Sequence, residues 1–429
     1  MRFVVFFLFL LVSPLVLSEE DSQQSYTEFE REIRQVVDPL VDQRLISGYF
    51  LSVHRFGEPI LEISNGSADD ELSLAPGPDV LYAVASMTKP VTALAIVQLI
   101  DKGRLSLEDP LSKYIPQFEN MLVAEGGSYD SQLEPARSPI LIKHLLTHTS
   151  GLTYSSTITG VGDVANAYKD LGLFTADSSS AEVDLKTQLD RLAELPLVAH
   201  PGTSYNYSVS YDVLTFVIEE VSGESFDRYM SKNIFEPLRM SDSHFFLPQE
   251  KLDRLSRLYA PLTRTFQIPG TPKMYQKSDF IEKGAKNYGE NARFPTGGAS
   301  LLTTGRDYQK FVSFLMRPNE FPAVDISRDA IGLMLNDQVA SGFGYNLMVD
   351  AMGPQAGNRT MSYGLGLKYQ QNSEGSPDYD YHFWGGAFNT RFWFDIETGV
   401  SGVFLTQLFP TRYDVTGRLD EVADKFFSD

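Results

Sequence analysis

The sequence predicts an α+β fold: an antiparallel sheet flanked by helices, with an inserted, mostly helical lobe. Two observations carry this prediction. Strand-like segments occur near both ends of the 429-residue chain, whereas residues 105–286 show helical patterns separated by long turns. Because strands from both ends can pair into one sheet, we expect a sheet domain at 26–104 plus 292–429 and a helical lobe at 105–291. The cleft between the two parts is the expected binding site.

The N-terminal part is expected to supply one helix and one hairpin. Tyr26–Ile46 carries apolar residues at helical spacing and ends before Ser47-Gly48, where a helix commonly stops. Tyr49–Arg55 and Pro59–Ile63 have the pattern of strands, and the turn Phe56-Gly57-Glu58 separates them. The segment therefore predicts a β-hairpin that follows a helix.

The last third of the chain returns to strand patterns. A Gly-rich loop within Arg293–Phe314 leads into a helix, and a final helix is expected over Gly417–Phe427. Between these helices we expect four further strands, at Tyr363–Tyr369, Tyr379–Trp384, Asn389–Asp395 and Gly399–Thr406.

Composition and charge restrict the class of protein. The chain has 42% hydrophobic and 21% charged residues, which is ordinary for a globular protein. Its formal net charge of −20 argues against nucleic acid or an anionic membrane surface as a partner. The chain contains no cysteine, which excludes disulfides, a thiolate nucleophile and thiol ligands for a metal.

The first residues have the pattern of an export signal. Arg2 precedes the apolar run Phe3–Leu17, and Ser18 stands before acidic residues, so residues 1–18 are expected to form a signal peptide cleaved after Ser18. The apolar run is shorter than the ~20 residues that a membrane-spanning helix needs. We therefore expect a secreted or periplasmic protein with no membrane span after signal removal. An uncleaved N-terminal anchor is the alternative.

A serine and a lysine stand close together near the start of the helical pattern Leu81–Arg104. Ser86 and Lys89 have the spacing i, i+3, which places two side chains on the same face of a helix. A serine at a helix N-terminus also lies among unpaired N–H groups, which favour developing negative charge. This pair suits a nucleophile that loses a proton and then holds an oxyanion. A capping serine with a solvated lysine is the alternative interpretation.

A second candidate element is the turn Pro201–Ser208, which precedes the apolar helix expected at Tyr211–Val221. Tyr205 and Tyr207 flank an asparagine in this turn, and turns commonly present side chains to a cleft. A phenol close to a lysine ammonium can act as a general base towards a serine. For Tyr205, packing of the loop against the helical lobe is the favoured interpretation.

A third candidate element is the strand segment His382–Ala387. Paired glycines, Gly385 and Gly386, weaken a strand and mark a bulge or the close approach of a backbone or ligand. Trp384 could form one wall of a substrate pocket. His382 lies two residues earlier, on the same face of the strand, and either lines the cleft or is packed. A structural bulge beside a core aromatic residue is the alternative.

These elements resemble the serine β-lactamase and penicillin-binding-protein superfamily, and most closely its class C-like branch that includes the family VIII carboxylesterases. The resemblance extends from about Tyr26 to Leu408. The matching segments are Ala85–Pro90, Leu145–Leu152, Pro201–Thr203 with Tyr207-Ser208, Phe235–Leu238, Gly297–Leu301 and Trp384–Gly386.

The resemblance implies a β-lactamase/transpeptidase-like fold and a role for each matching residue. Ser86 would be the acyl-accepting nucleophile and Lys89 its activating neighbour. Tyr207 would act as the base and later as the acid for the leaving group. The backbone N–H groups of Ser86 and Ala387 would form the oxyanion hole. The substrate-binding residues would be Trp384, Gly385, Gly386 and His382.

Two departures from the family pattern bear on the substrate. Val209 stands where the β-lactamase pattern Tyr-x-Asn has its asparagine. Trp384-Gly385-Gly386 replaces the Lys-Thr-Gly whose lysine helps to recognise the carboxylate of a β-lactam. Both changes resemble the esterase branch, and an aromatic residue in place of the lysine suits a neutral acyl or alkyl group.

Other catalytic and metal-binding patterns fail in this sequence. No G-x-S-x-G nucleophile elbow occurs. His144 and His148 have the spacing of a zinc pair, but Leu145 stands where H-E-x-x-H has its glutamate, so a structural role is favoured for both histidines. No Gly-rich phosphate loop with a following lysine is present. We therefore expect neither a metal nor another cofactor.

The sequence thus predicts an exported serine hydrolase that cleaves carboxylic esters through an acyl-enzyme on Ser86. Its expected partner is a small-molecule ester or amide. Three alternatives stay open: a β-lactamase or D-amino-acid peptidase or amidase, a transacylase, and a non-catalytic scaffold of the same fold. The sequence carries no signal for an oligomeric state.

Overall fold

A computed structural model of the chain describes residues 19–174, 183–261, 275–277, 294–339, 359–371, 377–410, 418–419 and 421–422. The expected signal peptide and most of the helix expected over 417–427 lie outside these ranges. Within them, no helix combines the length and apolar character needed to cross a membrane.

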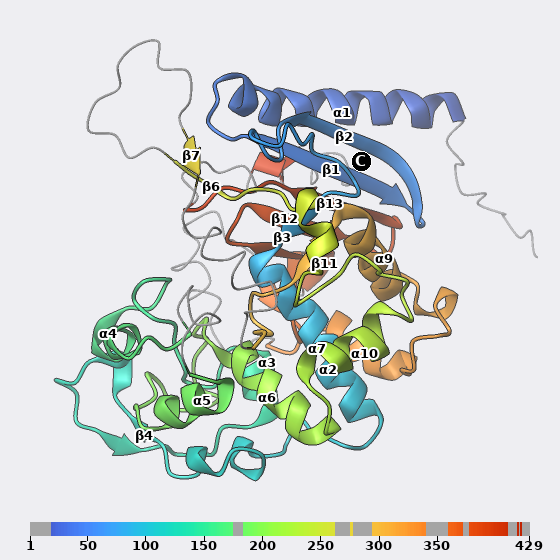
Figure 1. Cartoon of the computed structure of the whole chain (residues 1–429). Helices are drawn as coiled ribbons and strands as arrows, with labels where there is room; N and C mark the ends of the chain where they lie inside the picture. The colour runs from blue at the N-terminus through green and yellow to red at the C-terminus, as the bar shows by residue number, and fades with distance from the viewer. Residues whose placement is uncertain are drawn as a thin grey trace, which may run out of the picture.

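The helices and strands of the described ranges are shown in Figure 1. The helices are α1 (Glu19–Asp42), α2 (Thr88–Asp101), α3 (Ile142–Leu146), α4 (Gly162–Asp170), α5 (Leu185–Ala193), α6 (Ser210–Ser222), α7 (Phe226–Met230), α9 (Gly305–Met316) and α10 (Arg328–Leu335), with short turns η1 (Ala85–Met87) and η4 (Glu125–Gly127) among others. The strands are β1 (Gly48–Arg55), β2 (Glu58–Gly66), β3 (Leu81–Ala83), β4 (Leu122–Val123), β5 (Glu134–Pro135), β6 (Tyr259–Pro261), β7 (Tyr275–Lys277), β8 (Leu302–Thr304), β9 (Arg359–Met361), β10 (Gly366–Gln371), β11 (Pro377–Gly386), β12 (Thr390–Phe394) and β13 (Val400–Leu405).

One antiparallel sheet combines strands from both ends of the chain. Its seven strands have the order β2-β1-β13-β12-β11-β10-β9. The N-terminal hairpin joins the C-terminal strands where β1 pairs with β13, for example Phe50 opposite Leu405. The predicted α+β class with an antiparallel sheet flanked by helices is therefore confirmed.

Six strands of the sheet lie where the sequence predicts them, with shifts of a few residues at their ends. The seventh, β9, was not predicted, because a three-residue edge strand is too short to show a period-two pattern. The first helix also differs from its expected range of 26–46. It begins at Glu19 and stops at Asp42, because Arg44 adopts a left-handed backbone (φ 59°) that ends the helix.

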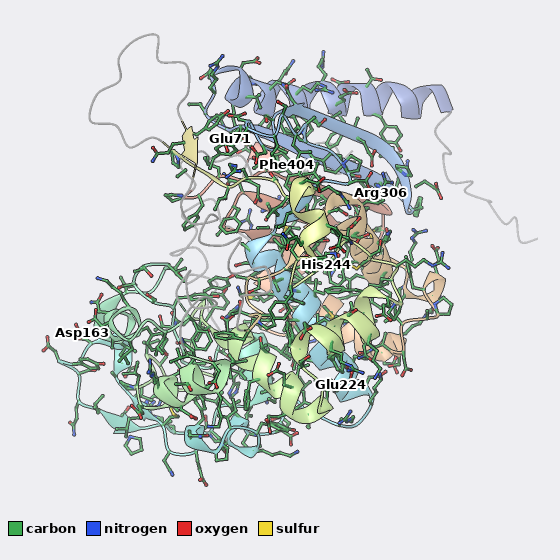
Figure 2. The ribbon with its side chains drawn as sticks, viewed as in Figure 1. Glu71, Asp163, Glu224, His244, Arg306 and Phe404 are labelled. Carbon is green, nitrogen blue, oxygen red and sulfur yellow. The ribbon has the colours of Figure 1, made fainter. Side chains whose placement is uncertain are left out.

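Helices cover both faces of the sheet. Phe29, Ile33 and Val37 of α1 are spaced four residues apart and are buried against β1 and β13. Burial of one such side chain contributes about 2 kcal/mol to stability. The Tyr49 ring of β1 stacks on the Phe404 ring of β13. Figure 2 labels Phe404 in the sheet next to α1. The opposite face packs on α9, so both faces of the sheet's central strands are buried.

Helices α3, α4, α5 and α6, from the middle of the chain, form a second region that lies apart from the large sheet (Figure 1). It is mostly helical but also contains the short pair β4–β5. The pair β6–β7 lies instead beside the large sheet, where Tyr259 of β6 bridges to Leu408 (Figure 1). The sequence patterns predicted neither pair. The domain boundaries at 104/105 and 291/292 stay a prediction, because residues 278–293 lie outside the described ranges.

Helix α2 connects the two regions. Its residues Thr88 to Leu99 are all buried, and it packs on both α6 and α10. A helix that is apolar on every side must be surrounded by protein. Lys89 is the only charged residue in this stretch, and its side chain is nevertheless fully buried. A buried lysine requires polar partners, which identifies the start of α2 as the place to look for a site.

Candidate active site

Ser86 lies in the 3₁₀ turn η1, immediately before α2. The preceding residue, Ala85, has a left-handed backbone (φ 45°), so the helical backbone that leads into α2 cannot extend back beyond Ser86. The Thr88 hydroxyl donates a hydrogen bond to the Ala85 carbonyl over 2.6 Å and stabilises this turn. Ser86 was expected at the start of the helix itself, and the structure places it two positions before Thr88, in the short turn that leads into α2. A non-glycine residue with positive φ is disfavoured and often marks a functional site.

Lys89 and Ser86 contact one another as their spacing predicts. Lys89 Nζ lies 3.1 Å from Ser86 Oγ and donates a hydrogen bond to it. The lysine side chain is fully buried, whereas Ser86 is partly accessible to solvent. The interpretation of the pair as a capping serine with a solvated lysine is therefore wrong. The arrangement places an accessible hydroxyl in contact with a buried amine.

The Gly-rich loop before β8 connects Lys89 to a carboxylate that the sequence analysis missed. Lys89 Nζ donates to the Gly298 carbonyl over 2.8 Å, and the Gly298 N–H donates to Asp212 Oδ1 over 3.1 Å. A Cβ atom on Gly298 would lie 2.6 Å from Asp212 Oδ1, so only glycine fits between the lysine and the carboxylate. Asp212 lies in the first turn of the mostly apolar helix α6, five positions after Tyr207. The available signal was an acidic residue in an apolar stretch, seven positions before the next acidic residue, Glu219.

Asp212 is expected to couple the site to pH. Burial raises the pKa of Asp212 to about 6, while the nearby Lys89 and the Gly298 N–H act in the opposite direction. Because its folded pKa lies above the ordinary value of 3.8, ionised Asp212 lowers stability progressively as pH rises from about 4 to about 6. Its charge is lost as pH falls through about 6, which weakens the link to Gly298 and Lys89.

We therefore predict that wild-type kcat decreases below pH 6 and that Asp212→Asn flattens this limb. At pH 8 the variant should lose about tenfold in kcat, the loss expected when one charge-assisted hydrogen bond is replaced by a neutral one. The pH–rate profiles of both proteins check this. An unchanged acidic limb in the variant would assign the limb to another group.

Tyr207 lies beside the lysine. Lys89 Nζ is 4.7 Å from the centroid of the Tyr207 ring and 5.6 Å from that of Tyr154. The Tyr207 ring also packs against Tyr154 and Trp384, at centroid distances of 5.3 and 6.1 Å. The structure therefore brings together Ser86, Lys89, Tyr207 and Trp384. The sequence analysis missed Tyr154, because it lies in an irregular segment without a recognisable period.

The glycine pair of β11 allows the strand to approach the serine turn. A Cβ atom on Gly386 would lie 2.2 Å from the Val84 carbonyl oxygen and 2.2 Å from Thr390 Oγ1. The close approach that the glycines indicated is thus made by the protein's own backbone. Ala387, the second expected oxyanion donor, is exposed and follows β11 in the turn to β12. The end of β11 and the turn with Ser86 are in contact.

Because the Ala387 N–H is the second expected oxyanion donor, Gly386→Ala is expected to lower turnover by about 10²-fold, the usual cost of losing one such donor. The added methyl group pushes the end of β11 away from Val84 and displaces the neighbouring Ala387 N–H. Gly385→Ala is the matched comparison, because its Cβ would meet only the Thr390 carbonyl, at 3.3 Å. Steady-state kinetics of both variants check the prediction, and a larger loss for Gly385→Ala would contradict it.

His382 is packed. It is 8% exposed, its Nε2 lies 2.8 Å from the Leu335 carbonyl oxygen, and its ring stacks on Phe394 at 4.7 Å. Burial also lowers its pKa. These contacts anchor β11 to α10 and favour the packed alternative for this residue. Its role in substrate binding stays a prediction.

The remaining predicted site residues lie in the same neighbourhood. Tyr205 is buried, as favoured for it, and its ring contacts that of His148. Trp384 is 6% exposed and lies beside Tyr207, a position compatible with its expected role as one wall of a substrate pocket. His148, one of the two histidines given a structural role, has its ring centroid 4.5 Å from that of Tyr207. His144 lies four positions earlier and bonds to the N–H of Leu141.

One cluster outside this site has donors of the kinds that metals bind. Ligand atoms of Glu125, Glu134 and His200 lie within 4.8 Å of one another. His200 Nδ1, however, accepts the N–H of Arg137, so the ring proton is on Nε2, which lies 2.6 Å from Glu134. Arg137 also forms an ion pair with Glu134. His200, Glu134 and Arg137 are thus paired with one another, and these contacts stabilise the loop before Tyr207.

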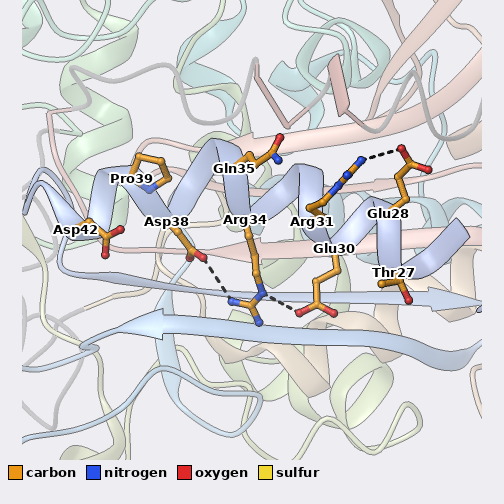
Figure 3. A pocket seen from close by; sticks show the side chains of 9 residues that line it. All are labelled: Thr27, Glu28, Glu30, Arg31, Arg34, Gln35, Asp38, Pro39 and Asp42. Carbon is orange, nitrogen blue, oxygen red and sulfur yellow. Dashed lines mark hydrogen bonds and ion pairs between the residues drawn. The ribbon is translucent and has the colours of Figure 1, made fainter. Parts of the chain in front are cut away.

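A wide hollow lies along the polar side of α1, far from the serine in sequence (Figure 3). Ion pairs within the helix, such as Arg34 with Glu30, occupy it. It carries none of the predicted catalytic residues. Its lining residues are Thr27, Glu28, Glu30, Arg31, Arg34, Gln35, Asp38, Pro39 and Asp42.

An accessible serine hydroxyl, bonded to a buried lysine beside a tyrosine ring, is an arrangement for acyl transfer through a serine. The chain belongs to the Beta-lactamase family, whose sequence profile matches residues 33–425. The predicted superfamily and the β-lactamase/transpeptidase-like fold are therefore confirmed.

Individual relatives include esterases and acyltransferases. Esterase EstB of Burkholderia gladioli is 28% identical over 390 residues, covering 86% of this chain and 88% of its own length. Acyltransferase calJ of Penicillium decumbens is 29% identical over 345 residues, or 77% of each chain. Among solved structures, EstCE1, described as a hydrolase with promiscuous acyltransferase activity, superposes with a TM-score of 0.73 at 22% identity, covering 94% of this chain and 99% of its own. The family is thus one of serine hydrolases with esterase and acyltransferase members.

Proposed function

We propose that this protein is a serine carboxylesterase that cleaves small-molecule esters through an acyl-enzyme on Ser86. The observation that carries the proposal is the 3.1 Å contact between Lys89 Nζ and Ser86 Oγ, in a place where the lysine is fully buried. A buried amine without a catalytic or structural role is costly, and this one lies directly against the accessible hydroxyl. The family and the esterase relative support the same reaction class.

In the acylation step, Ser86 Oγ attacks the carbonyl carbon of the ester. In the proposal Tyr207 takes part as the phenolate, which the charge of Lys89 beside its ring favours. The serine proton passes to the phenolate oxygen as Ser86 Oγ forms its bond to the carbonyl carbon, and the negative charge moves to the carbonyl oxygen. The bond from the carbonyl carbon to the alkoxy oxygen then breaks, and Tyr207 returns the proton to the leaving alcohol. Water repeats the sequence in the second half-reaction and releases the acid and free Ser86.

The tetrahedral intermediate carries its negative charge on the former carbonyl oxygen. In the proposal, the N–H groups of Ser86 and Ala387 bind this oxyanion. The narrow approach of β11 to the segment before Ser86 supports this pairing, because Gly386 lets the strand end reach the serine turn. Loss of one such donor commonly costs about 10²–10³ in turnover.

The substrate preference follows from apolar side chains at two positions. Trp384 presents an indole beside Tyr207, and Val209 is fully buried, so neither supplies a charged or amide group for a polar substrate. We propose a neutral acyl or alkyl ester as the substrate. The acyltransferase relative supports a second outcome, in which an alcohol or amine replaces water as the acyl acceptor.

The test is to compare initial rates on p-nitrophenyl butyrate and on a chromogenic cephalosporin. We expect the rate on the ester to exceed the rate on the cephalosporin. During turnover, mass spectrometry of the intact protein should show the gain of one butyryl group, and mass spectrometry of its peptides should place that group on Ser86. Added butanol would reveal the transacylase outcome as butyl butyrate. Dominant cephalosporin turnover, or an acyl group on another residue, would overturn the proposal.

A further inference from the structure

The segment that carries Tyr207 is bonded on both sides of the tyrosine by one distant residue. The Asn206 N–H donates a hydrogen bond to the His148 carbonyl over 2.7 Å. The Ser208 N–H donates to His148 Nδ1 over 3.3 Å. His148 is thus bonded through its main chain to the residue before Tyr207 and through its ring to the residue after it.

The imidazole of His148 also packs directly on the phenol. It is fully buried, and its centroid lies 4.5 Å from that of Tyr207, with the ring planes tilted by 51°. The rings of Tyr205 and Tyr211 contact it at 5.9 and 5.2 Å. Because Nδ1 accepts the Ser208 N–H, the ring proton is assigned to Nε2, which has no hydrogen-bond partner among the described residues.

The surroundings of the His148 ring favour its neutral form. Burial, with the nearby charge of Lys89, holds the pKa of His148 well below its usual 6.5. A neutral ring adds no second cation beside Lys89, so the lysine alone sets the positive charge next to Tyr207. A protonated ring would also lose the Nδ1 lone pair that accepts the Ser208 N–H.

A chain of buried hydroxyl groups continues from Ser208 to a second buried turn. Ser208 Oγ lies 3.2 Å from His148 Nδ1 and 2.8 Å from Ser210 Oγ, and Ser210 Oγ lies 2.9 Å from Ser150 Oγ. All four residues are fully buried. The three serine hydroxyl groups and His148 Nδ1 all have partners in this network, and such paired buried groups restrict the arrangement of the segments that they join. Here it joins the segment 148–150 to the segment 208–210, with Tyr207 at its edge.

We propose that His148 is a positioning residue for Tyr207 and acts on catalysis only through the placement of that phenol. The inference rests on the catalytic role of Tyr207 in the proposed function. His148 adopts a left-handed backbone (φ 54°), which is unfavourable for a non-glycine residue and is retained where the surroundings require it. A displacement of a catalytic group by about 1 Å commonly costs about 10² in rate.

The test uses two substitutions that both tolerate the left-handed backbone. His148→Gly removes the ring and its acceptor but keeps the carbonyl bonded to Asn206. His148→Asn supplies an amide oxygen close to the position of Nδ1. We expect His148→Gly to lower kcat for the ester by about 10²-fold with little change in KM, and His148→Asn to recover at least about tenfold of that loss. His144→Gln is the matched control and should leave kcat close to wild type.

The same substitutions in a Tyr207→Phe background separate positioning from general damage. If His148 acts through Tyr207, neither substitution lowers the residual rate of Tyr207→Phe any further. A further loss of the same size in that background would overturn the proposal, as would a wild-type kcat for His148→Gly. If thermal melts show that His148→Gly is not folded, the double-mutant cycle of His148→Asn with Tyr207→Phe tests in the same way whether His148 acts through Tyr207.

A separate measurement tests the proposed function on which this inference rests. Wild-type protein should be labelled by a fluorophosphonate on Ser86. No labelling would show that the proposed function has failed. Labelling together with additive effects of His148 and Tyr207 would show that the function holds and the positioning role does not.

Discussion

Replacement of Ser86 by alanine is expected to reduce ester hydrolysis by about 10⁴–10⁶-fold, the range seen when a catalytic serine is removed from other serine hydrolases. The physical reason is that no other hydroxyl bonded to Lys89 occurs among the described residues. The Ser86 N–H is retained in the variant, so any remaining rate reports the oxyanion hole and substrate binding alone. Steady-state rates and fluorophosphonate labelling measure the loss.

Ser131→Ala is a suitable control for this experiment. Ser131 lies between β4 and β5 and its hydroxyl bonds only within its own loop, to Ser128. It should be labelled and should turn over ester as the wild type does. A Ser86→Ala protein that keeps more than about a hundredth of the wild-type rate would contradict the assignment of the nucleophile, since general acid–base effects alone account for about 10²–10⁴.

Lys89→Met is expected to have the second largest effect, a loss of about 10³–10⁴ in kcat. Methionine fills a similar volume but removes the hydrogen bonds to Ser86 Oγ and the Gly298 carbonyl and the charge above the Tyr207 ring. Lys89→Arg should not restore activity, because a planar guanidinium does not fit a site shaped for a compact ammonium. Rates and labelling of both variants check this.

The methionine variant should also change how stability depends on pH. The charge of Lys89 lowers the pKa of Asp212, so its removal raises that pKa above about 6. A raised carboxyl pKa means that stability falls as pH rises from the unfolded value towards the folded one. We therefore expect a larger decrease in melting temperature between pH 5 and pH 8 for Lys89→Met than for the wild type.

The double variant Lys89→Met/Asp212→Asn is the control for the stability prediction. It carries neither the buried cation nor the buried carboxylate, so its melting temperature should vary little between these pH values. If the single and double variants show the same pH dependence, Asp212 is not the group that Lys89 stabilises.

The parts of the site that the sequence predicted are formed by residues close together in the chain. Ser86 and Lys89 are three positions apart, and local backbone geometry is enough to bring such a pair into contact. The strands of the sheet were predictable for the same reason, because alternation along a strand is a local pattern. The glycines at the end of β11 indicated a close approach, although they did not identify Val84 as the group that comes close.

Contacts between distant segments account for what the sequence patterns missed. Lys89 and Gly298 are 209 positions apart, and their contact depends on how the loop before β8 lies between α2 and α6. Asp212 and His148 belong to the site only because that packing brings them there. Asp212 is one of three acidic residues on a mostly apolar helix, and His148 stands in a turn. Nothing in either local sequence predicts which distant residue it contacts.

The sequence by itself determined the fold class, most strands of the sheet, and the pair Ser86 and Lys89, because these depend on patterns within one segment. Only the tertiary structure decided that Ser86 precedes α2 in a separate turn, that the lysine is fully buried, and that His148 bonds to both neighbours of Tyr207. The physical reason is that burial, and the hydrogen bonds that burial requires, depend on which distant segments pack together.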